Sequence, residues 1–146
     1  MVDSETKRWR WLGAAANAHA LLYRVTRGRI GQRFRDLPPM LLLEHTGARS
    51  GISRHTPLAY VRDGESFVVV ASKGGYPRHP AWFHNLSAHP DVTVRVGARR
   101  IAVRAHVADP SERARLWPRA VEAYPGYAQY AQRTTREIPL VVLEPR

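Results

Sequence analysis

The segment Glu44–Pro57 reads EHTGARSGISRHTP and joins two apolar runs, Met40–Leu43 before it and Leu58–Val61 after it. Its two glycines, Gly47 and Gly51, let the backbone bend and approach a ligand closely. Successive N–H groups of such a turn can form an anion-binding nest. The spacing matches neither the Walker A motif nor GxGxxG. We expect two strands joined by a loop that either cradles a phosphate or turns its arginines to water.

The composition is that of one globular domain with an unusual excess of positive charge. The chain has 146 residues, 44% of them hydrophobic, which is enough to build a core. It carries 23 Lys and Arg against 12 Asp and Glu, a formal net charge of +11. Nucleic acid, anionic lipid or a polyanionic small molecule could each use such a surface. Because no cysteine is present, disulfides and cysteine-ligated metals are excluded.

Targeting signals are not visible in the sequence. Asp3 and Glu5 stand where a secretory signal peptide would be basic, and no clean apolar region follows them. No uninterrupted apolar run approaches the ~20 residues that a membrane-spanning helix needs. We therefore expect a cytoplasmic protein.

Residues 1–39 are predicted to form an N-terminal amphipathic helix and a basic connector. Helical periodicity extends over residues 4–25, and residues 24–35 alternate arginines with glycines until Pro38-Pro39 ends the segment. The apolar face of the helix consists of Trp9, Leu12, Ala16, Ala20 and Tyr23. This helix either packs on the rest of the molecule or lies on an anionic surface, in peripheral contact with the inner face of the cell membrane.

Residues 40–146 are predicted to form one domain that is mainly β. Period-2 patterns and turn signals such as Asp63-Gly64 indicate six strands, at residues 40–45, 54–62, 66–71, 91–96, 99–107 and 138–143. Helices are expected at residues 79–88 and 109–123, with a short further piece up to Arg133. This order suggests an α+β fold, a closed or nearly closed antiparallel β-barrel with helices packed outside.

A second glycine-rich turn, Ser72–Gly75, precedes an aromatic helix that begins near Pro80. It carries Lys73, one of the few lysines in a chain whose cations are almost all arginine. This turn and the Gly47–Arg54 loop both stand at the ends of strands that could be neighbours in one sheet. Together they suit an anionic cofactor with an aromatic ring system, with its phosphates on the turns and its ring against Trp82. The alternative is that Trp82 packs in the core.

Three tyrosines, Tyr124, Tyr127 and Tyr130, recur at a spacing of three residues. This spacing places them near one face of a helix. Two interpretations stay open: the face lines a pocket, or it is buried against the barrel.

Other kinds of active site find little support in the sequence. His79, His84 and His89 are five residues apart, which does not suit one helix face, and HExxH is absent, so we expect no metal site. The carboxylates are scattered and suggest no acid–base pair. Ser50 and Ser72 lie outside any GxSxG elbow, so a serine hydrolase is not indicated.

Five motifs follow one another in the order TGARSG, RHTPLAYVRDG, VVVASKGG, HPAWFHNLSAHPDVTV and YPGYAQYAQRTTREIPLVVLEP. In this order and spacing they resemble the deazaflavin-dependent nitroreductase family, actinobacterial split-barrel enzymes that use coenzyme F420. The resemblance covers residues 41–145. It implies a split antiparallel β-barrel, related to the barrel that binds flavin mononucleotide (FMN), with flanking helices.

The resemblance also implies an activity, the transfer of a hydride from reduced F420 to an electron-poor acceptor such as a quinone or a nitro compound. The cofactor carries a phosphate and an oligoglutamate tail, and this polyanion would give the charge of +11 a use. The absence of an acid–base set is consistent with such chemistry, because the cofactor carries the reactive carbon while the protein orients it.

Site residues are carried over position by position from the motifs. The residues predicted to bind the cofactor are Gly47, Arg49, Ser50, Gly51, Arg54, Pro57, Ala71, Ser72, Lys73, Gly74, Gly75, Ala81, Trp82 and Asn85. The residues predicted to line the acceptor side are Tyr124, Tyr127 and Tyr130. Ser72 and Tyr130 are predicted to act in catalysis by stabilising charge on the reduced acceptor.

Three alternative functions remain at this stage. A protein with the same barrel could bind FMN, or it could bind the deazaflavin without turning over an acceptor. Nucleic acid is a third possible partner, through the arginine-rich residues 24–35. No nucleic-acid motif appears and no aromatic side chains interleave with these arginines, so we expect no nucleic-acid partner.

Overall fold

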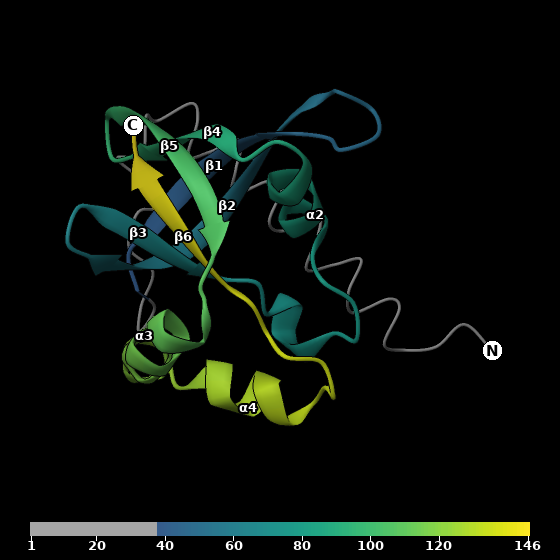
Figure 1. Ribbon diagram of the computed structural model, residues 1–146, viewed down its shortest axis with the longest axis vertical. Coiled ribbons are helices and arrows are strands. Elements are labelled where there is room, and N and C mark those ends of the chain that lie inside the picture. Colours follow the sequence, from purple (N-terminus) through teal and green to yellow (C-terminus); the bar gives the residue numbers. More distant parts are fainter. Residues whose placement is uncertain (1–37) are drawn as a thin grey trace.

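The computed structural model describes residues 38–146; the predicted helix at residues 4–25 and its basic connector lie outside this range. The strands are β1 (Met40–Thr46), β2 (Ser53–Asp63), β3 (Ser66–Val70), β4 (Asp91–Val96), β5 (Arg99–Val107) and β6 (Leu140–Pro145). The helices are the short 3-10 helix η1 (Lys73–Gly75), α2 (Ala81–Ala88), α3 (Pro110–Ala123) and α4 (Gly126–Gln132). Figure 1 shows the sheet wrapped on itself, with the helices outside it.

The six strands close into an antiparallel barrel in the order β1-β2-β3-β6-β5-β4. Two long strands each serve two neighbours. Ser53–Ala59 of β2 pair with β1, and the rest of β2, from Tyr60 onward, pairs with β3. In the same way β5 pairs with β4 through its first part and with β6 through its second. The predicted mainly β split-barrel fold is confirmed.

Two apolar cores share the wall formed by β3 and β6. Phe67 and Val69 of β3 point into the barrel, where α2 adds Trp82 and Leu86. Val68 and the other outward residues of β3 and β6 pack instead against α3 and α4. Because successive side chains of a strand point to opposite faces, a strand buried on both faces reads as an unbroken apolar run. This explains the continuous apolar sequences at residues 67–71 and 140–143.

The strand registers place both predicted binding turns at one end of the barrel. Thr46 at the end of β1 pairs with Ser53 at the start of β2, and Val70 at the end of β3 pairs with Leu140 at the start of β6. Since neighbouring strands are antiparallel, the β1–β2 loop, the segment after β3 and the connections into β4 and β6 share this end. The tight β2–β3 and β4–β5 turns lie at the other end.

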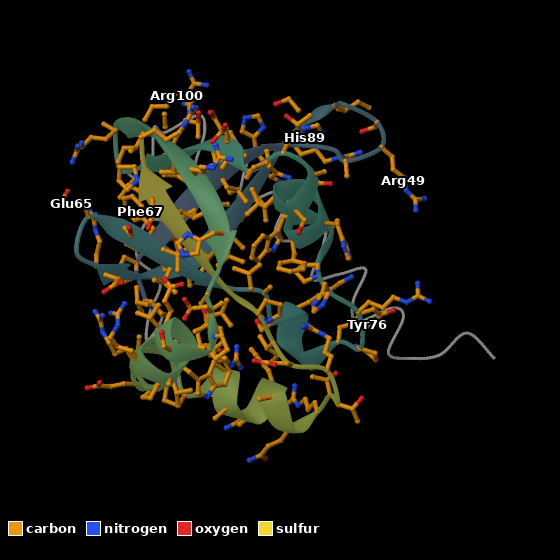
Figure 2. All side chains as sticks on the ribbon, in the orientation of Figure 1. Arg49, Glu65, Phe67, Tyr76, His89 and Arg100 are labelled. Atoms are coloured by element: carbon orange, nitrogen blue, oxygen red, sulfur yellow. The ribbon has the colours of Figure 1, made fainter. Side chains whose placement is uncertain are left out.

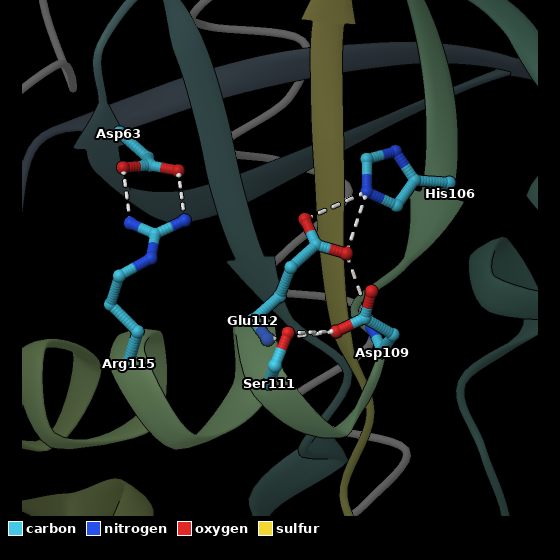
Figure 3. A network of polar contacts seen from close by, with 6 residues as sticks. All are labelled: Asp63, His106, Asp109, Ser111, Glu112 and Arg115. Carbon is cyan, nitrogen blue, oxygen red and sulfur yellow. Dashed lines mark hydrogen bonds and ion pairs between the residues drawn. The ribbon is translucent and has the colours of Figure 1, made fainter.

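Helix α3 begins as the sequence predicts, with Asp109 as its N-cap and Pro110 in its first turn. Asp109 accepts a hydrogen bond from the Glu112 N–H, and the Glu112 carboxylate accepts one from the Asp109 N–H, which completes a capping box. Glu112 also pairs with His106 of β5, at 3.0 Å. A bidentate ion pair from Arg115 to Asp63 ties the helix to the end of β2 (Figure 3).

Two predicted elements begin later than expected, both because of a proline. Helix α2 begins at Ala81, since the residue before a proline is biased towards extended conformations and Pro80 itself is the N-cap. Strand β6 begins at Leu140, two residues after the expected Ile138, since Pro139 has no N–H to give to a strand ladder. Within residues 38–146, no helix is both long enough and apolar enough to cross a bilayer.

Candidate cofactor site

The β1–β2 loop, residues 47–52, is closed by two backbone hydrogen bonds. The Gly47 N–H donates to the Ile52 carbonyl at 2.9 Å, and the Gly51 N–H donates to the Gly47 carbonyl at 3.0 Å. A side chain at position 47 would displace the Ser50 hydroxyl, and Gly51 has a φ of +69°, in the left-handed region that favours glycine. Arg49 points outward from the tip of this loop (Figure 2), and Arg54 beyond it is also exposed.

A chain of polar side chains under this loop connects three elements. Asn85 of α2 accepts a hydrogen bond from the Ala48 N–H at 2.9 Å through Oδ1, and its Nδ2 lies 3.0 Å from Nδ1 of His45 on β1. The other ring nitrogen of His45 lies 2.8 Å from the Thr56 hydroxyl on β2. His45 is 4% exposed and Asn85 is 7% exposed. Burial, together with the nearby His55 and Arg54, lowers the pKa of His45 to about 4.

The turn at Ser72–Gly75 has an unusual backbone. Ser72 is in the right-handed helical region, and it is followed by three left-handed residues, Lys73 with a φ of 45°, Gly74 with 61° and Gly75 with 81°. A right-handed residue followed by a left-handed one directs successive N–H groups to one side, which is the geometry of an anion-binding nest. Lys73 adopts this conformation although it is not glycine, and such outliers concentrate at functional sites.

Arg136, just before β6, holds this segment from beneath. Its guanidinium donates to the carbonyls of Ala71 at 3.1 Å, Ser72 at 2.8 Å and Tyr76 at 2.9 Å. It also donates to Nδ1 of His79, at 3.0 Å. Burial lowers the pKa of Arg136; burial and the guanidinium of Arg136 lower that of His79, and His84 adds to the shift. All four partners are neutral, so none of these contacts cancels the positive charge of Arg136.

Helix α4 presses against the same turn through its own backbone. A side chain at Gly75 would lie 2.6 Å from the Tyr130 carbonyl oxygen and 2.9 Å from Arg133. No residue but glycine fits this contact without displacing α4. The turn at Ser72–Gly75 and the tyrosine helix therefore form one unit.

The three tyrosines form a cluster with two polar hydroxyls in contact. The Tyr124 and Tyr130 hydroxyl oxygens are 3.0 Å apart, and the Tyr124 and Tyr127 rings meet edge to face at 4.9 Å. Tyr127 is 7% exposed and belongs to the outer core, whereas the other two are half-buried at its border. Burial, with the neighbouring tyrosines, raises the pKa of Tyr127, so its hydroxyl stays protonated. The interpretation of a buried face thus holds for Tyr127, and the interpretation of a pocket lining stays a prediction.

The predicted site residues fall into two groups at one end of the barrel. The first is the β1–β2 loop with Asn85, and the second is the Ala71–Gly75 segment with Tyr130. Of the remaining predicted residues, Ala81 is exposed, Pro57 is half-buried on β2, and Trp82 is 6% exposed within the barrel core. The structure does not bring the Trp82 ring to the surface of either turn.

Two further features lie away from these turns. A groove of about 750 Å³ runs between α3 and the segment before β6, lined by Trp117, Arg113, Pro139 and neighbouring residues. None of the predicted site residues lines it; His79, which accepts a hydrogen bond from Arg136, is one of its lining residues. Across residues 38–146, no three His, Asp or Glu side chains gather as metal ligands would.

Comparison with known proteins identifies the family to which this chain belongs. The family model described as F420H2-dependent quinone reductase matches residues 16–145. The chain belongs to the F420H2-dependent quinone reductase family. The predicted resemblance to F420-using split-barrel enzymes is thereby confirmed, and with it the prediction of an oxidoreductase whose cofactor is F420. The FMN alternative is not needed.

Relatives in this F420H2-dependent quinone reductase family match over most of the chain. The F420H2-dependent quinone reductase Rv1261c of Mycobacterium tuberculosis is 48% identical over 131 residues, which are 88% of each chain. A solved structure titled as an F420-H2 dependent reductase, FDR-A, is 42% identical, with a TM-score of 0.67 over 73% of this chain and 94% of its own. A second, titled as a domain-swapped dimer, is 37% identical, with a TM-score of 0.69 over 97% of this chain and 100% of its own.

Sequence reasoning overlooked two residues of this F420H2-dependent quinone reductase that organise the predicted turns, His45 and Arg136. His45 lies two residues before Gly47, but its partner Asn85 is 40 residues further along the chain. Arg136 is 64 residues from Ser72. No local signal marked Arg136, because the segment RTTREIPLVV is polar up to Glu137 and a half-buried arginine there is not distinguished from a solvated one by sequence.

Proposed function

We propose that this protein transfers a hydride from reduced F420 to a quinone, with the anionic part of the cofactor held by the β1–β2 loop and the Ser72–Gly75 turn. The observation that carries the proposal is the backbone of Ser72–Gly74, which has the conformation of an anion nest. It occurs in a chain that belongs to the F420H2-dependent quinone reductase family.

The residues at this end of the barrel fit a polyanionic cofactor. Arg49, Arg54 and Lys73 are all exposed there, and guanidinium groups suit phosphate and carboxylate oxygens. Arg136 adds a half-buried charge directly under the nest, held only by neutral partners. A positive site of this kind attracts an anion over several ångströms.

The ring of the bound cofactor supplies the hydride, and the protein supplies position and polarity. Ser72 is 8% exposed, and within residues 38–146 its hydroxyl has no hydrogen-bond partner. A buried hydroxyl without a partner is costly in a folded protein, which is explained if it donates to a ligand. Ser72 is therefore our candidate donor to the acceptor oxygen that gains negative charge.

Tyr130 is the second candidate donor. In the Tyr124–Tyr130 pair, either hydroxyl can act as the donor. The ring of Tyr127, whose hydroxyl stays protonated, packs edge to face against the ring of Tyr124 and so helps to hold this pair in place. A quinone oxygen near the pair could thus receive a hydrogen bond from either hydroxyl.

The decisive experiment titrates the purified protein with F420 and, separately, with FMN, and then supplies reduced F420 together with a soluble quinone. We expect F420 to bind selectively, Arg54→Ala to weaken its binding about tenfold, and Ser72→Ala to lower kcat about a hundredfold while F420 affinity changes little. Arg104→Ala, an exposed arginine on β5, is the matched control. Selective FMN binding, or F420 binding without quinone turnover, would overturn the proposal.

The physiological setting follows from the same proposal. A quinone with a lipid tail resides in a membrane, whereas reduced F420 is water-soluble, so we place the enzyme in the cytoplasm close to the inner membrane face. The basic residues 24–35 are suited to an anionic lipid surface. This placement rests on sequence, because the residues concerned precede those that the structure describes.

A further inference from the structure

The polar chain under the β1–β2 loop has a single consistent arrangement of protons. The Ala48 N–H can only donate, so the Asn85 side-chain oxygen must face it and the Asn85 NH2 group must face His45. Nδ1 of His45 therefore accepts, which leaves the ring proton on Nε2. This proton is donated to the Thr56 hydroxyl, 2.8 Å away.

Each of the three contacts in this chain pairs one donor with one acceptor, and its two central side chains are almost inaccessible to water. His45 is 4% exposed and Asn85 is 7% exposed. A buried polar network is favourable only when it is fully satisfied. This chain of hydrogen bonds is called the relay and runs from Thr56 through His45 and Asn85 to the Ala48 N–H. It fixes one conformation of the loop backbone next to Arg49 and Ser50.

Asn85 cannot hold the loop alone. If its amide lost the His45 acceptor, the NH2 group would be buried without a partner, and a rotation to find another would turn the oxygen away from Ala48. His45 is also held at a fixed angle by Thr56 on the neighbouring strand. The position of the loop thus depends on a histidine that does not contact it directly.

We infer that His45 is a positioning residue for the cofactor, which acts through Asn85 and the Ala48 N–H to hold the Arg49–Ser50 tip of the β1–β2 loop in its binding conformation. The inference rests on the proposed function for the identity of the ligand. It also assigns Asn85 a positioning task, because the oxygen and the NH2 group of its amide each hold a partner within the protein.

The test compares three variants of the full chain with wild type. His45→Phe keeps an aromatic ring of similar size but removes both nitrogens. His45→Gln restores one acceptor and one donor on a single amide. His89→Phe, at an exposed histidine at the end of α2 (Figure 2), is the matched control.

Two readouts separate this inference from the proposed function. The first is the hydrogen-exchange protection of the Ala48 amide without any cofactor, measured relative to the Tyr60 amide, which bonds to the Pro39 carbonyl. The second is F420 affinity. We expect His45→Phe to lower Ala48 protection at least tenfold and to weaken F420 binding about tenfold, His45→Gln to recover most of both, and His89→Phe to change neither.

The outcomes that would overturn the inference are specific. Unchanged Ala48 protection in His45→Phe would show that the relay does not hold the loop, and lowered protection with unchanged F420 affinity would show that the loop position does not serve the cofactor. Thr56→Val removes only the partner of His45 Nε2. This variant provides an independent test of the relay if His45→Phe does not fold. Failure of wild type to bind F420 would refute the proposed function and the cofactor role of His45, while the exchange data would still decide whether His45 anchors the loop.

Discussion

The β1–β2 loop and the Ala71–His79 segment lie at the same end of the barrel, yet they are held by opposite kinds of chemistry. The first is fixed by a neutral relay that reaches its backbone at one point, Ala48. The second is fixed by a guanidinium, Arg136, which reaches three carbonyls, and by the close approach of α4 to Gly75. One loop therefore has a single anchor and an exposed tip, while the other is clamped along its length.

This difference suggests a division of tasks between the two. A clamped, left-handed turn presents its N–H groups in one fixed direction, as recognition of a phosphate at a defined position requires. A loop with a single anchor and exposed arginines can follow a longer, variable anion such as an oligoglutamate tail. The comparison predicts that the clamped segment is the less tolerant of mutation.

The largest difference should appear between two alanine substitutions at left-handed glycines. Gly75→Ala places a methyl group 2.6 Å from the Tyr130 carbonyl oxygen at a φ of +81°, and we expect it to lower the free energy of unfolding by about 3 kcal/mol. Gly51→Ala meets nothing within 4 Å at a φ of +69°, so only backbone strain remains, about 1 kcal/mol. Urea unfolding followed by circular dichroism measures both; equal losses would contradict the comparison.

The next effect concerns the clamp itself. Arg136→Met keeps the length of the side chain but removes the donors to Ala71, Ser72 and Tyr76, and we expect a loss of about 2 kcal/mol. The same variant removes the charge under the nest, so F420 affinity should fall and should depend less steeply on salt. The exposed Arg104 serves as control as Arg104→Met. Unaltered salt dependence in Arg136→Met would show that its charge has no part in binding.

The smallest effect is expected from acid on the relay. The pKa of His45 is lowered to about 4 in the fold, below the ordinary value of about 6.5 in the unfolded chain, so the unfolded state binds more protons between these values. Stability from this group is therefore lost as pH falls, by about 1.5 kcal/mol between pH 6.5 and 5. Arg54 and His55 of β2 add to this cost of charging the ring. Asp91 and Glu44 line the same pocket as His45, and Glu44 is paired with Arg95 and Arg100.

The measurement is the midpoint of urea unfolding over this pH range, in wild type and in His45→Gln. Because glutamine does not titrate, the variant should show a shallower decline towards low pH. Identical slopes in the two proteins would mean that His45 titrates normally in the fold.

The strands were predictable from sequence because local rules determine them. Alternating Val92–Val96 and the Asp63-Gly64 turn each carry their signal within a few residues. The capping of α3 by Asp109 was predictable for the same reason. The errors at α2 and β6 arose where Pro80 and Pro139 acted on their neighbours, and each shifted an end by two residues.

Of the site, only the positions of its two backbone turns were predictable from the sequence. Glycines at 47, 51, 74 and 75 marked both turns because backbone geometry is local. The side chains that hold these turns come from distant parts of the chain, as with Arg136 and Ser72 or His45 and Asn85. Hydrogen bonds at such separations leave no spacing pattern, so only the folded arrangement of strands shows them.

The order of strands also affects how the protein is made. Strand β6 is the last in sequence, but it lies between β3 and β5 and contributes to both cores. During synthesis, neither core can be completed until residues 140–145 have left the ribosome. Until then, the edges of β3 and β5 that face β6 have no strand to pair with. Such unpaired edges are prone to pair with other chains. The nascent barrel thus depends on its final strand, and a chaperone that shields β3 would protect it during that interval.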